Sequence, residues 1–169
     1  MGFQWAGKDV IGYVHETYPD LRLMQTETEC GNGSNDRAEM EHTFELLKHY
    51  FSNGANFYMY WNMVLESNGL SHWGWRQNSM ISISEDDQVV YNPEFYLMKH
   101  FSYFIRPNAR FINLGTGENC LAFVNDDDEV IIIYYNGNEK PVIKTFAVGE
   151  SNTSLELKGK SINTVSVKL

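Results

Sequence analysis

The sequence predicts an α/β region followed by an all-β region, and the change lies near Pro107. Before Pro107, short apolar runs alternate with helical patterns, which is typical of βα units around a parallel sheet. After Pro107, short β-rich runs are separated by turns, which is typical of an antiparallel sandwich. Because 169 residues give room for one domain and part of another, we predict domains at residues 1–107 and 108–169.

Composition narrows the function classes. A hydrophobic content of 43% with 21% charged residues indicates a packed globular protein. The net charge of −9 argues against a nucleic-acid partner, because proteins that bind phosphate backbones concentrate Lys and Arg. No apolar run is long enough to predict a transmembrane segment. The aromatic fraction of 14% suits either a carbohydrate-binding surface or an ordinary aromatic core.

The first fifty residues predict strands and helices in alternation. Gly2–Trp5 reads as a strand end, and Leu21–Thr26 reads as a buried strand. A helix over Asp9–Tyr18 is expected to present Val10, Tyr13, Val14 and Tyr18 on its apolar face. A second helix begins at Asn35 or Asp36 and ends at Asn53-Gly54. Its apolar stripe is Met40, Phe44, Leu47 and Phe51.

The following residues complete the α/β region. Ala55–Trp61 is a continuous apolar run, expected for a strand covered on both faces. Leu65–His72 reads as a loop and Met80–Ser84 as a short strand. Asn92-Pro93-Glu94 predicts the start of a helix, because proline is favoured at the first helical position. The core side of this helix is expected to carry Phe95, Met98, Phe101, Phe104 and Ile105.

The last third of the chain predicts a sandwich. Its six β runs are Arg110–Leu114, Cys120–Asn125, Val130–Asn136, Val142–Val148, Leu155–Lys158 and Ile162–Lys168. The turns between them include Asp126–Asp128, Asn136–Asn138 and Lys158–Lys160. The aspartates resemble a calcium loop in charge alone, since the alternating oxygen ligands and the distal glutamate are missing, and we interpret them as a hairpin turn.

The stretch Leu21–Gly31 carries the candidate chemistry. The run ends in TETE, so Glu27 and Glu29 follow a predicted strand. Side chains at the carboxyl ends of parallel strands meet substrate in barrel enzymes, and a carboxylate there acts as nucleophile or acid/base. The alternative is a pair of solvated carboxylates at a strand end. The tryptophans Trp5, Trp61, Trp73 and Trp75 likewise have two interpretations, as core residues or as platforms for sugar rings.

Other chemistries find little support in the sequence. The five histidines are dispersed without metal-ligand spacing, so we expect no metal site. GNGSND lacks the glycine spacing and the lysine of a phosphate loop. Cys30 has no histidine at informative spacing, and with Cys120 as the second of two cysteines the redox compartment is not fixed. We therefore expect no cofactor.

Four motifs in order resemble glycoside hydrolase family 30, the glucosylceramidase-like family whose bacterial members include β-1,6-glucanases. They are QTETECG, YMYWNMVLE, HWGWRQNSM and YNPEFYLMKHFSYFIRP. The resemblance implies the C-terminal part of a (β/α)8 barrel followed by a β-sandwich side domain. It also implies a retaining hydrolase acting on a β-linked glucoside or glucan.

The resemblance also implies roles for single residues. Glu27, in the Thr-Glu of QTETECG, falls at the nucleophile position of the family, and Trp61 falls at the tryptophan that floors its sugar pocket. Trp5 falls at an aromatic-bearing strand end. The loop after the last barrel strand supplies three further candidates for substrate binding, Trp73, Trp75 and Asn78.

One departure from the family sets limits on activity. The acid/base glutamate of the family belongs to an Asn-Glu-Pro motif, and the only Asn-Glu here is Asn138-Glu139, in a predicted turn. We therefore expect a C-terminal fragment of an exported enzyme, inactive alone and able to self-associate through exposed sheet edges. The alternative is a non-catalytic carbohydrate-binding module that uses sandwich aromatics such as Tyr134 or Tyr135.

Overall fold

The chain forms two compact units, Met1–Met98 and Lys99–Leu169. The structure, a computed structural model, describes residues 1–115 and 119–169. The division between the units falls inside helix α3 (Pro93–Phe104). The domain limit at residue 107, drawn from composition, stays a prediction.

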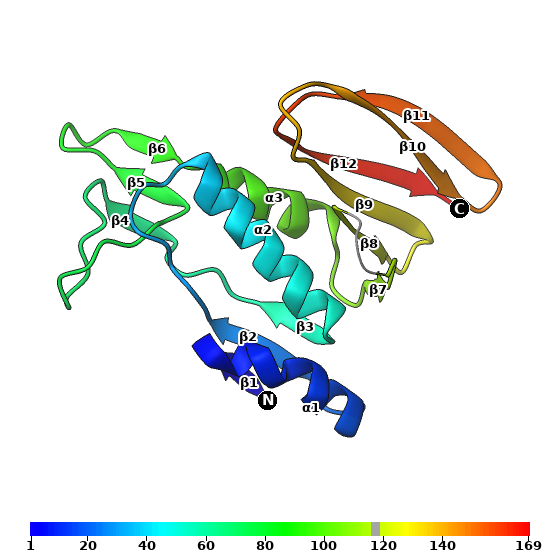
Figure 1. Cartoon of the computed structure of the whole chain (residues 1–169), viewed down its shortest axis with the longest axis horizontal. Helices are drawn as coiled ribbons and strands as arrows, with labels where there is room; N and C mark the ends of the chain where they lie inside the picture. Colours follow the sequence, from blue (N-terminus) through cyan, green and yellow to red (C-terminus); the bar gives the residue numbers. More distant parts are fainter. Residues whose placement is uncertain (116–118) are drawn as a thin grey trace. The chain divides into compact units, whose positions relative to one another are not determined.

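The first unit contains a parallel sheet in the order β1-β2-β3 (Figure 1). The three strands are β1 (Gly2–Gln4), β2 (Leu23–Glu27) and β3 (Ala55–Tyr58). Helical segments separate them along the chain, so the predicted βα rhythm and its parallel pairing are confirmed. A parallel pair requires such a crossover connection.

Two helices connect these strands. After β1, a 3-10 helix η1 (Trp5–Val10) leads into α1 (Ile11–Thr17). After β2, α2 (Arg37–Ser52) begins at Asp36, whose side chain accepts a hydrogen bond from the Glu39 backbone N–H at 3.2 Å. Gly54, with a φ of 88°, follows the end of α2 in the left-handed conformation that stops helices. The predicted α2 and its cap are confirmed.

The sheet and both helices share a core. Phe3, Ile11, Leu23, Tyr50 and Ala55 form one buried cluster. The predicted apolar face of the first helix is wrong in part, because Val10, Tyr13 and Tyr18 are exposed and Ile11 is the buried residue. The 3-10 helix before α1 has three residues per turn, so an α-helical period started at Asp9 assigns side chains to the wrong faces.

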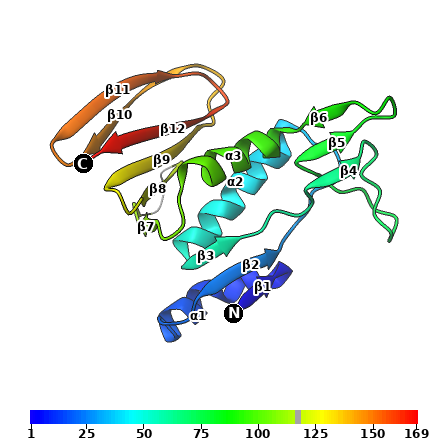
Figure 2. The same cartoon turned by 180° about the vertical axis from the view of Figure 1, so that it is seen from behind.

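The rest of the first unit differs from the predictions in two places. β3 is shorter than predicted, and its Asn56 and Phe57 are exposed where a strand covered on both faces was predicted. Part of the predicted loop forms β4 (Val64–Glu66). This strand pairs with β5 (Ile81–Ile83), which also pairs with β6 (Val89–Tyr91), in a small mixed sheet (Figure 2).

The second unit is an antiparallel sandwich, and all six predicted β runs form strands. They are β7 (Arg110–Ile112), β8 (Cys120–Val124), β9 (Glu129–Asn136), β10 (Val142–Val148), β11 (Ser151–Leu157) and β12 (Ser161–Lys168). One sheet has the order β12-β9-β8-β7, and β10 pairs with β11. Side chains of both sheets form one core of Ala122, Val130, Ile132, Phe146 and Leu157.

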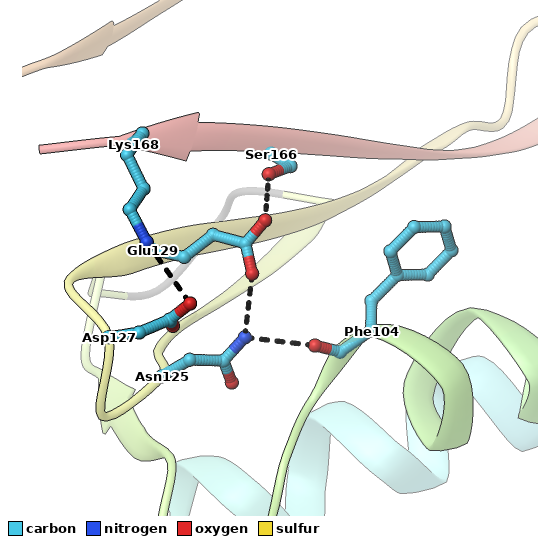
Figure 3. Close-up of polar contacts among 6 residues, drawn as sticks. All are labelled: Phe104, Asn125, Asp127, Glu129, Ser166 and Lys168. Atoms are coloured by element: carbon cyan, nitrogen blue, oxygen red, sulfur yellow. Dashed lines mark hydrogen bonds and ion pairs between the residues drawn. The ribbon is translucent and has the colours of Figure 1, made fainter.

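The end of α3 is attached to this sandwich. Phe101 packs edge-on against Phe123 of β8, with ring centroids 6.4 Å apart. Asn125, in the turn after β8, donates to the Phe104 carbonyl at 3.0 Å and to Glu129 at 3.1 Å (Figure 3). Its own side-chain oxygen accepts from the Arg106 backbone N–H at 3.0 Å. One buried amide thus links the carboxyl end of the helix to the hairpin.

The predicted turn at the three aspartates is confirmed as the β8–β9 hairpin, and it is tied to the last strand. Lys168 donates to Asp127 at 3.1 Å, and Ser166 donates to Glu129 (Figure 3). The bond from Lys168 holds the pKa of Asp127 below its usual value. The bonds from Ser166 and then Asn125 lower the pKa of Glu129.

Candidate functional site

The carboxyl ends of the three parallel strands bring together residues that are far apart in the sequence. In the β1–β2 register Gln4 lies opposite Glu27, and in the β2–β3 register Gln25 lies opposite Tyr58. Trp5 and Trp61 therefore follow their strands at the same edge of the sheet at which β2 ends in Glu27. Trp61 is joined to the next residue through a cis peptide bond.

Trp5 and Glu27 are in direct contact. The indole Nε1 donates a hydrogen bond to Glu27 Oε1 at 3.1 Å, and the glutamate is half-buried. Trp5 has a φ of 46°, in the left-handed region that a bulky residue rarely adopts. Such a backbone costs about 1–3 kcal/mol and persists only where the surrounding structure imposes it. The fold thus fixes the indole against the carboxylate at the strand end.

Glu29 has a different environment from Glu27. The Lys8 ammonium, from η1, pairs with Glu29 Oε1, and the Thr28 hydroxyl donates to Glu29 Oε2. The Lys8 and Glu29 side chains are 27% and 30% exposed, so water screens the pair in part. Both oxygens of Glu29 are therefore occupied by protein groups, one of them a cation.

An open cleft of about 710 Å³ begins at this edge. The segment after β2, from Glu29 to Asn32, forms one part of its wall, and Trp75 with Arg76 forms another. The lining residues are Trp5, Glu29, Cys30, Gly31, Asn32, Glu39, His42, Trp75 and Arg76. Two of the predicted sugar-binding tryptophans, Trp5 and Trp75, therefore face one cavity.

The four tryptophans are surface residues. Their exposed fractions are 45% for Trp5, 43% for Trp61, 71% for Trp73 and 50% for Trp75. The rings of Trp73 and Trp75 stack, with centroids 5.6 Å apart and planes at 14°. Burial of large aromatic side chains is a main source of core stability, so four exposed ones need another explanation. Their exposure argues against the core interpretation, and their binding of sugar stays a prediction.

Asn78 lies in a different environment from the tryptophans. It is 2% exposed, and its amide is satisfied by protein groups. Its Nδ2 donates to Glu94 Oε1 at 2.9 Å, and its Oδ1 accepts from the Gly33 backbone N–H at 2.7 Å. Direct substrate binding by Asn78 stays a prediction. The geometry shows an amide that holds two chain segments together.

Sequence reasoning missed the buried carboxyl of Glu94. This residue has no exposed surface, and burial raises its pKa to about 7. Burial, together with the nearby Glu94 carboxyl, also raises the pKa of Tyr60 far above its ordinary value. The one local signal, an acid after Asn92-Pro93, is that of a helix start and gives no hint of burial. A buried titratable group beside a candidate site often has a functional role.

Among residues 1–115 and 119–169, no group of three His, Cys, Asp or Glu side chains has metal-ligating geometry. In the same residues, no helix is long and apolar enough to cross a membrane. Cys30 is a buried free thiol, and burial raises its pKa.

Comparison with known proteins assigns the second unit. Residues 112–165 match the glycosyl hydrolase family 30 beta sandwich domain. This part of the chain is similar to the sandwich domain of that family. Two proteins of Caenorhabditis elegans are related to the chain: "Putative glucosylceramidase 2" is 29% identical over 139 residues, and "Putative glucosylceramidase 1" is 25% identical over 137 residues. These alignments cover 74% and 73% of this chain, and the resemblance to the glucosylceramidase-like family is confirmed.

Solved structures share the fold of the whole chain. SrfJ of Salmonella typhimurium superposes with a TM-score of 0.84 at 23% identity, and an endo-β1,6-glucanase with 0.83 at 24%. A family 30 endoxylanase of Clostridium papyrosolvens gives 0.72 at 15%. Each match covers 99% of this chain, but 40%, 40% and 48% of the other. The chain spans about a quarter of the length of the curated relatives, 27% and 26%.

Proposed function

We propose that the chain is part of a retaining β-glycoside hydrolase in which Glu27 is the nucleophile. The observation that carries the proposal is the Trp5–Glu27 hydrogen bond at the carboxyl edge of the parallel strands. This edge bears the active site in β/α barrel enzymes. We further propose that β1, β2 and β3 are the last three strands of a (β/α)8 barrel.

The chemistry requires a carboxylate in a fixed orientation. A retaining glycosidase attacks the anomeric carbon with one carboxylate while a second carboxyl group, about 5–5.5 Å away, protonates the leaving oxygen. The indole N–H restricts the Glu27 carboxylate to one orientation. Glu29 suits the nucleophile role less well, because Lys8 and Thr28 occupy its two oxygens.

The second carboxyl group belongs, in this proposal, to a part of the enzyme outside this chain. The sequence has no Asn-Glu-Pro, the motif of the family's acid/base glutamate. The isolated chain is therefore expected to turn over little or no substrate. We also propose that the enzyme acts outside the cytoplasm, a proposal that rests on the family resemblance alone.

The substrate we propose is a β-linked glucoside or glucan. Sugar rings have apolar faces that stack on aromatic side chains, and Trp5, Trp61, Trp73 and Trp75 offer exposed indoles near the strand ends. The named relatives include glucosylceramidases and a β1,6-glucanase, which supports a β-linked glucosyl unit.

The structure gives little support to a binding module based on the sandwich. Tyr135, one of the two predicted contact residues, is buried at 6% exposure. The other, Tyr134, packs edge-on against Phe146 and lies under the Lys144 ammonium. Both tyrosine rings therefore pack within the sandwich, whereas the exposed indoles belong to the first unit.

Azide rescue of the full-length enzyme tests the proposal. Glu27→Ala removes the nucleophile, so hydrolysis should fall by several orders of magnitude. Azide can then occupy the vacated face and attack an activated β-glycoside, which gives the α-glycosyl azide with inversion. Glu29→Ala is the matched control and should retain most activity and form no azide. A β-glycosyl azide from Glu27→Ala would contradict the assignment. So would loss of hydrolysis and its rescue by azide in Glu29→Ala alone.

A further inference from the structure

The segment that forms one wall of the cleft is attached to the rest of the unit by a buried polar cluster. The wall segment, as named here, is Gly31–Asn35 between β2 and α2, and its first two residues, Gly31 and Asn32, line the cleft. The cluster consists of buried side chains of the chain region after β3, namely Gln77, Asn78, Ser79, Ser82, Asn92 and Glu94. Burying so many polar groups is costly unless each finds a hydrogen-bond partner, so their arrangement needs a reason.

Asn78 makes the central connection. Its side-chain oxygen accepts from the Gly33 backbone N–H at 2.7 Å and from that of Asn35 at 3.4 Å. Its backbone N–H donates to the Cys30 carbonyl at 2.6 Å. Asn35 also binds this region, because its Oδ1 accepts from the Ser79 backbone N–H at 2.9 Å. The wall segment is thus held at Gly33 and Asn35, and Cys30, the residue before it, is held as well.

The orientation of the Asn78 amide depends on Glu94. An amide has a donor end and an acceptor end, and it can hold the wall segment only with the acceptor end toward Gly33. Glu94 Oε1 accepts from the donor end, Nδ2, at 2.9 Å. A Cβ on Gly31 would clash with the Asn78 amide and with Glu39 Oε2, so the contact is close. Glu94 Oε1 can accept in either protonation state, and by accepting from Nδ2 it keeps the amide oxygen turned toward Gly33.

We propose that Glu94 is a positioning residue that fixes the Asn78 amide and thereby holds the Gly31–Asn35 wall of the cleft in place. Its consequence for substrate rests on the proposed function, because this wall follows the strand that ends in Glu27. The positioning itself concerns only the chain and its hydrogen bonds.

The electrostatic surroundings of Glu94 agree with this role. The groups that act on its charge are Glu39 and Asp36, from the start of α2, and Tyr60 lies close enough to respond to it. These groups are acidic, and burial also opposes ionisation, so the neutral acid is favoured up to near neutral pH. A neutral glutamine can therefore replace Glu94 as the acceptor, whereas a leucine cannot.

Amide hydrogen exchange of this 169-residue chain tests the proposal without any sugar. Exchange is read by NMR at Gly33, and at Tyr135 in the sandwich as an internal standard. Glu94→Leu should raise the Gly33 exchange rate about tenfold, since one oriented hydrogen bond is lost. Glu94→Gln should stay within about threefold of the unsubstituted chain. Unchanged Gly33 exchange in Glu94→Leu, with Tyr135 also unchanged, would overturn the proposal.

A second pair of substitutions, which exchanges the amide of position 78 and the carboxyl of position 94, keeps the test informative if Glu94→Leu fails to fold. Asn78→Asp places two carboxyl groups together and should speed Gly33 exchange at pH 8. Adding Glu94→Gln supplies a donor to the carboxylate introduced at position 78, whose other oxygen can still accept from Gly33, so protection should return. A double variant no better protected than Asn78→Asp would refute the positioning role. If protection returns but no β-glucan binds, the positioning stands and the proposed function fails.

Discussion

Both units of the chain bury apolar side chains, but the first unit buries many more polar ones. In the sandwich unit, the buried polar residues that the structure describes are Asn125 and Asn136, and both join strands or turns through several hydrogen bonds. The first unit buries Gln25, Thr28, Thr43, Gln77, Asn78, Ser79, Ser82, Asn92 and Glu94. It also exposes all four tryptophans of the chain.

This contrast indicates which unit is built for packing and which for a site. Apolar burial stabilises a fold without directing any group toward a ligand. Oriented polar groups and exposed indoles add little to stability, but they position chemical groups at a surface. Substitutions of buried apolar side chains should therefore change the stability of the protein, whereas those of the oriented polar groups and exposed indoles of the first unit should change binding, pH response or reaction rate.

The largest stability effect is expected in the sandwich core. Phe146 is 7% exposed and packs against Tyr134, so Phe146→Ala should lower the free energy of unfolding by about 3–5 kcal/mol. Ile143→Ala, on the same strand but 77% exposed, should change it by less than about 0.5 kcal/mol. Urea unfolding measures both. Equal effects of the two substitutions would contradict the packing role assigned to this unit.

The next effect is a pH dependence that originates in the first unit. Glu94 has a pKa of about 7 in the folded chain and an ordinary value of 4.5, so the folded state binds more protons between these values. The contribution of Glu94 to stability therefore falls as pH rises from 4.5 to 7, by on the order of 3 kcal/mol, and is level above this range.

Glu94→Gln should abolish this contribution. Denaturant midpoints measured at pH 5 and pH 8 for the two chains give the difference directly. Glu45→Gln, at an exposed position of α2, is the matched control and should keep the unsubstituted dependence. An identical pH dependence in Glu94→Gln and the unsubstituted chain would show that the carboxyl titrates normally.

A smaller effect is expected at Asn125, a buried polar residue of the sandwich unit. Asn125→Ala removes the amide that joins the Phe104 carbonyl to Glu129 (Figure 3) and also binds the Arg106 N–H. The free energy of unfolding should therefore fall by about 1–3 kcal/mol. Asp126→Ala, at the exposed neighbouring position, should cost less than about 0.5 kcal/mol. If thermal unfolding cannot separate the two variants, the helix does not depend on this link.

The smallest effect concerns sugar binding. Trp75 lines the cleft and stacks on Trp73, so Trp75→Ala should weaken binding of a β-linked gluco-oligosaccharide about tenfold. Tyr103 is an exposed aromatic residue of the sandwich unit, and Tyr103→Ala should leave the affinity unchanged. Isothermal titration calorimetry measures the affinity of both variants for the oligosaccharide. If only Tyr103→Ala weakened binding, the carbohydrate-binding surface would lie on the second unit.

Sequence reasoning was most successful where local pattern determines structure. The six sandwich strands have β-rich runs bounded by turn residues, and α2 has both an apolar stripe and a capping aspartate, Asp36. The strand ends also placed Trp5 and Glu27 correctly at one sheet edge, since parallel strands end together. In these cases the signal lies within a few residues of the element.

Other features depend on contacts that no local pattern records. Glu94 looks like a solvated acid at a helix start, yet packing of distant segments leaves it no exposed surface. The partner of Glu29 is Lys8, 21 residues away, and the spacing between them indicates nothing about a pair. Asn78 was singled out as a substrate contact, and its role as a link between Gly33 and Glu94 required the fold.

The central claim is that the catalytic carboxylate is Glu27, held by Trp5 in the first unit. A 2-deoxy-2-fluoro β-glucoside with a good leaving group forms a stable glycosyl ester on the nucleophile of a retaining enzyme. Peptide mass spectrometry of the treated full-length enzyme should place this ester on Glu27. The isolated 169-residue chain should be labelled little or not at all. An ester on Glu29 or on any residue of the sandwich unit would contradict the account.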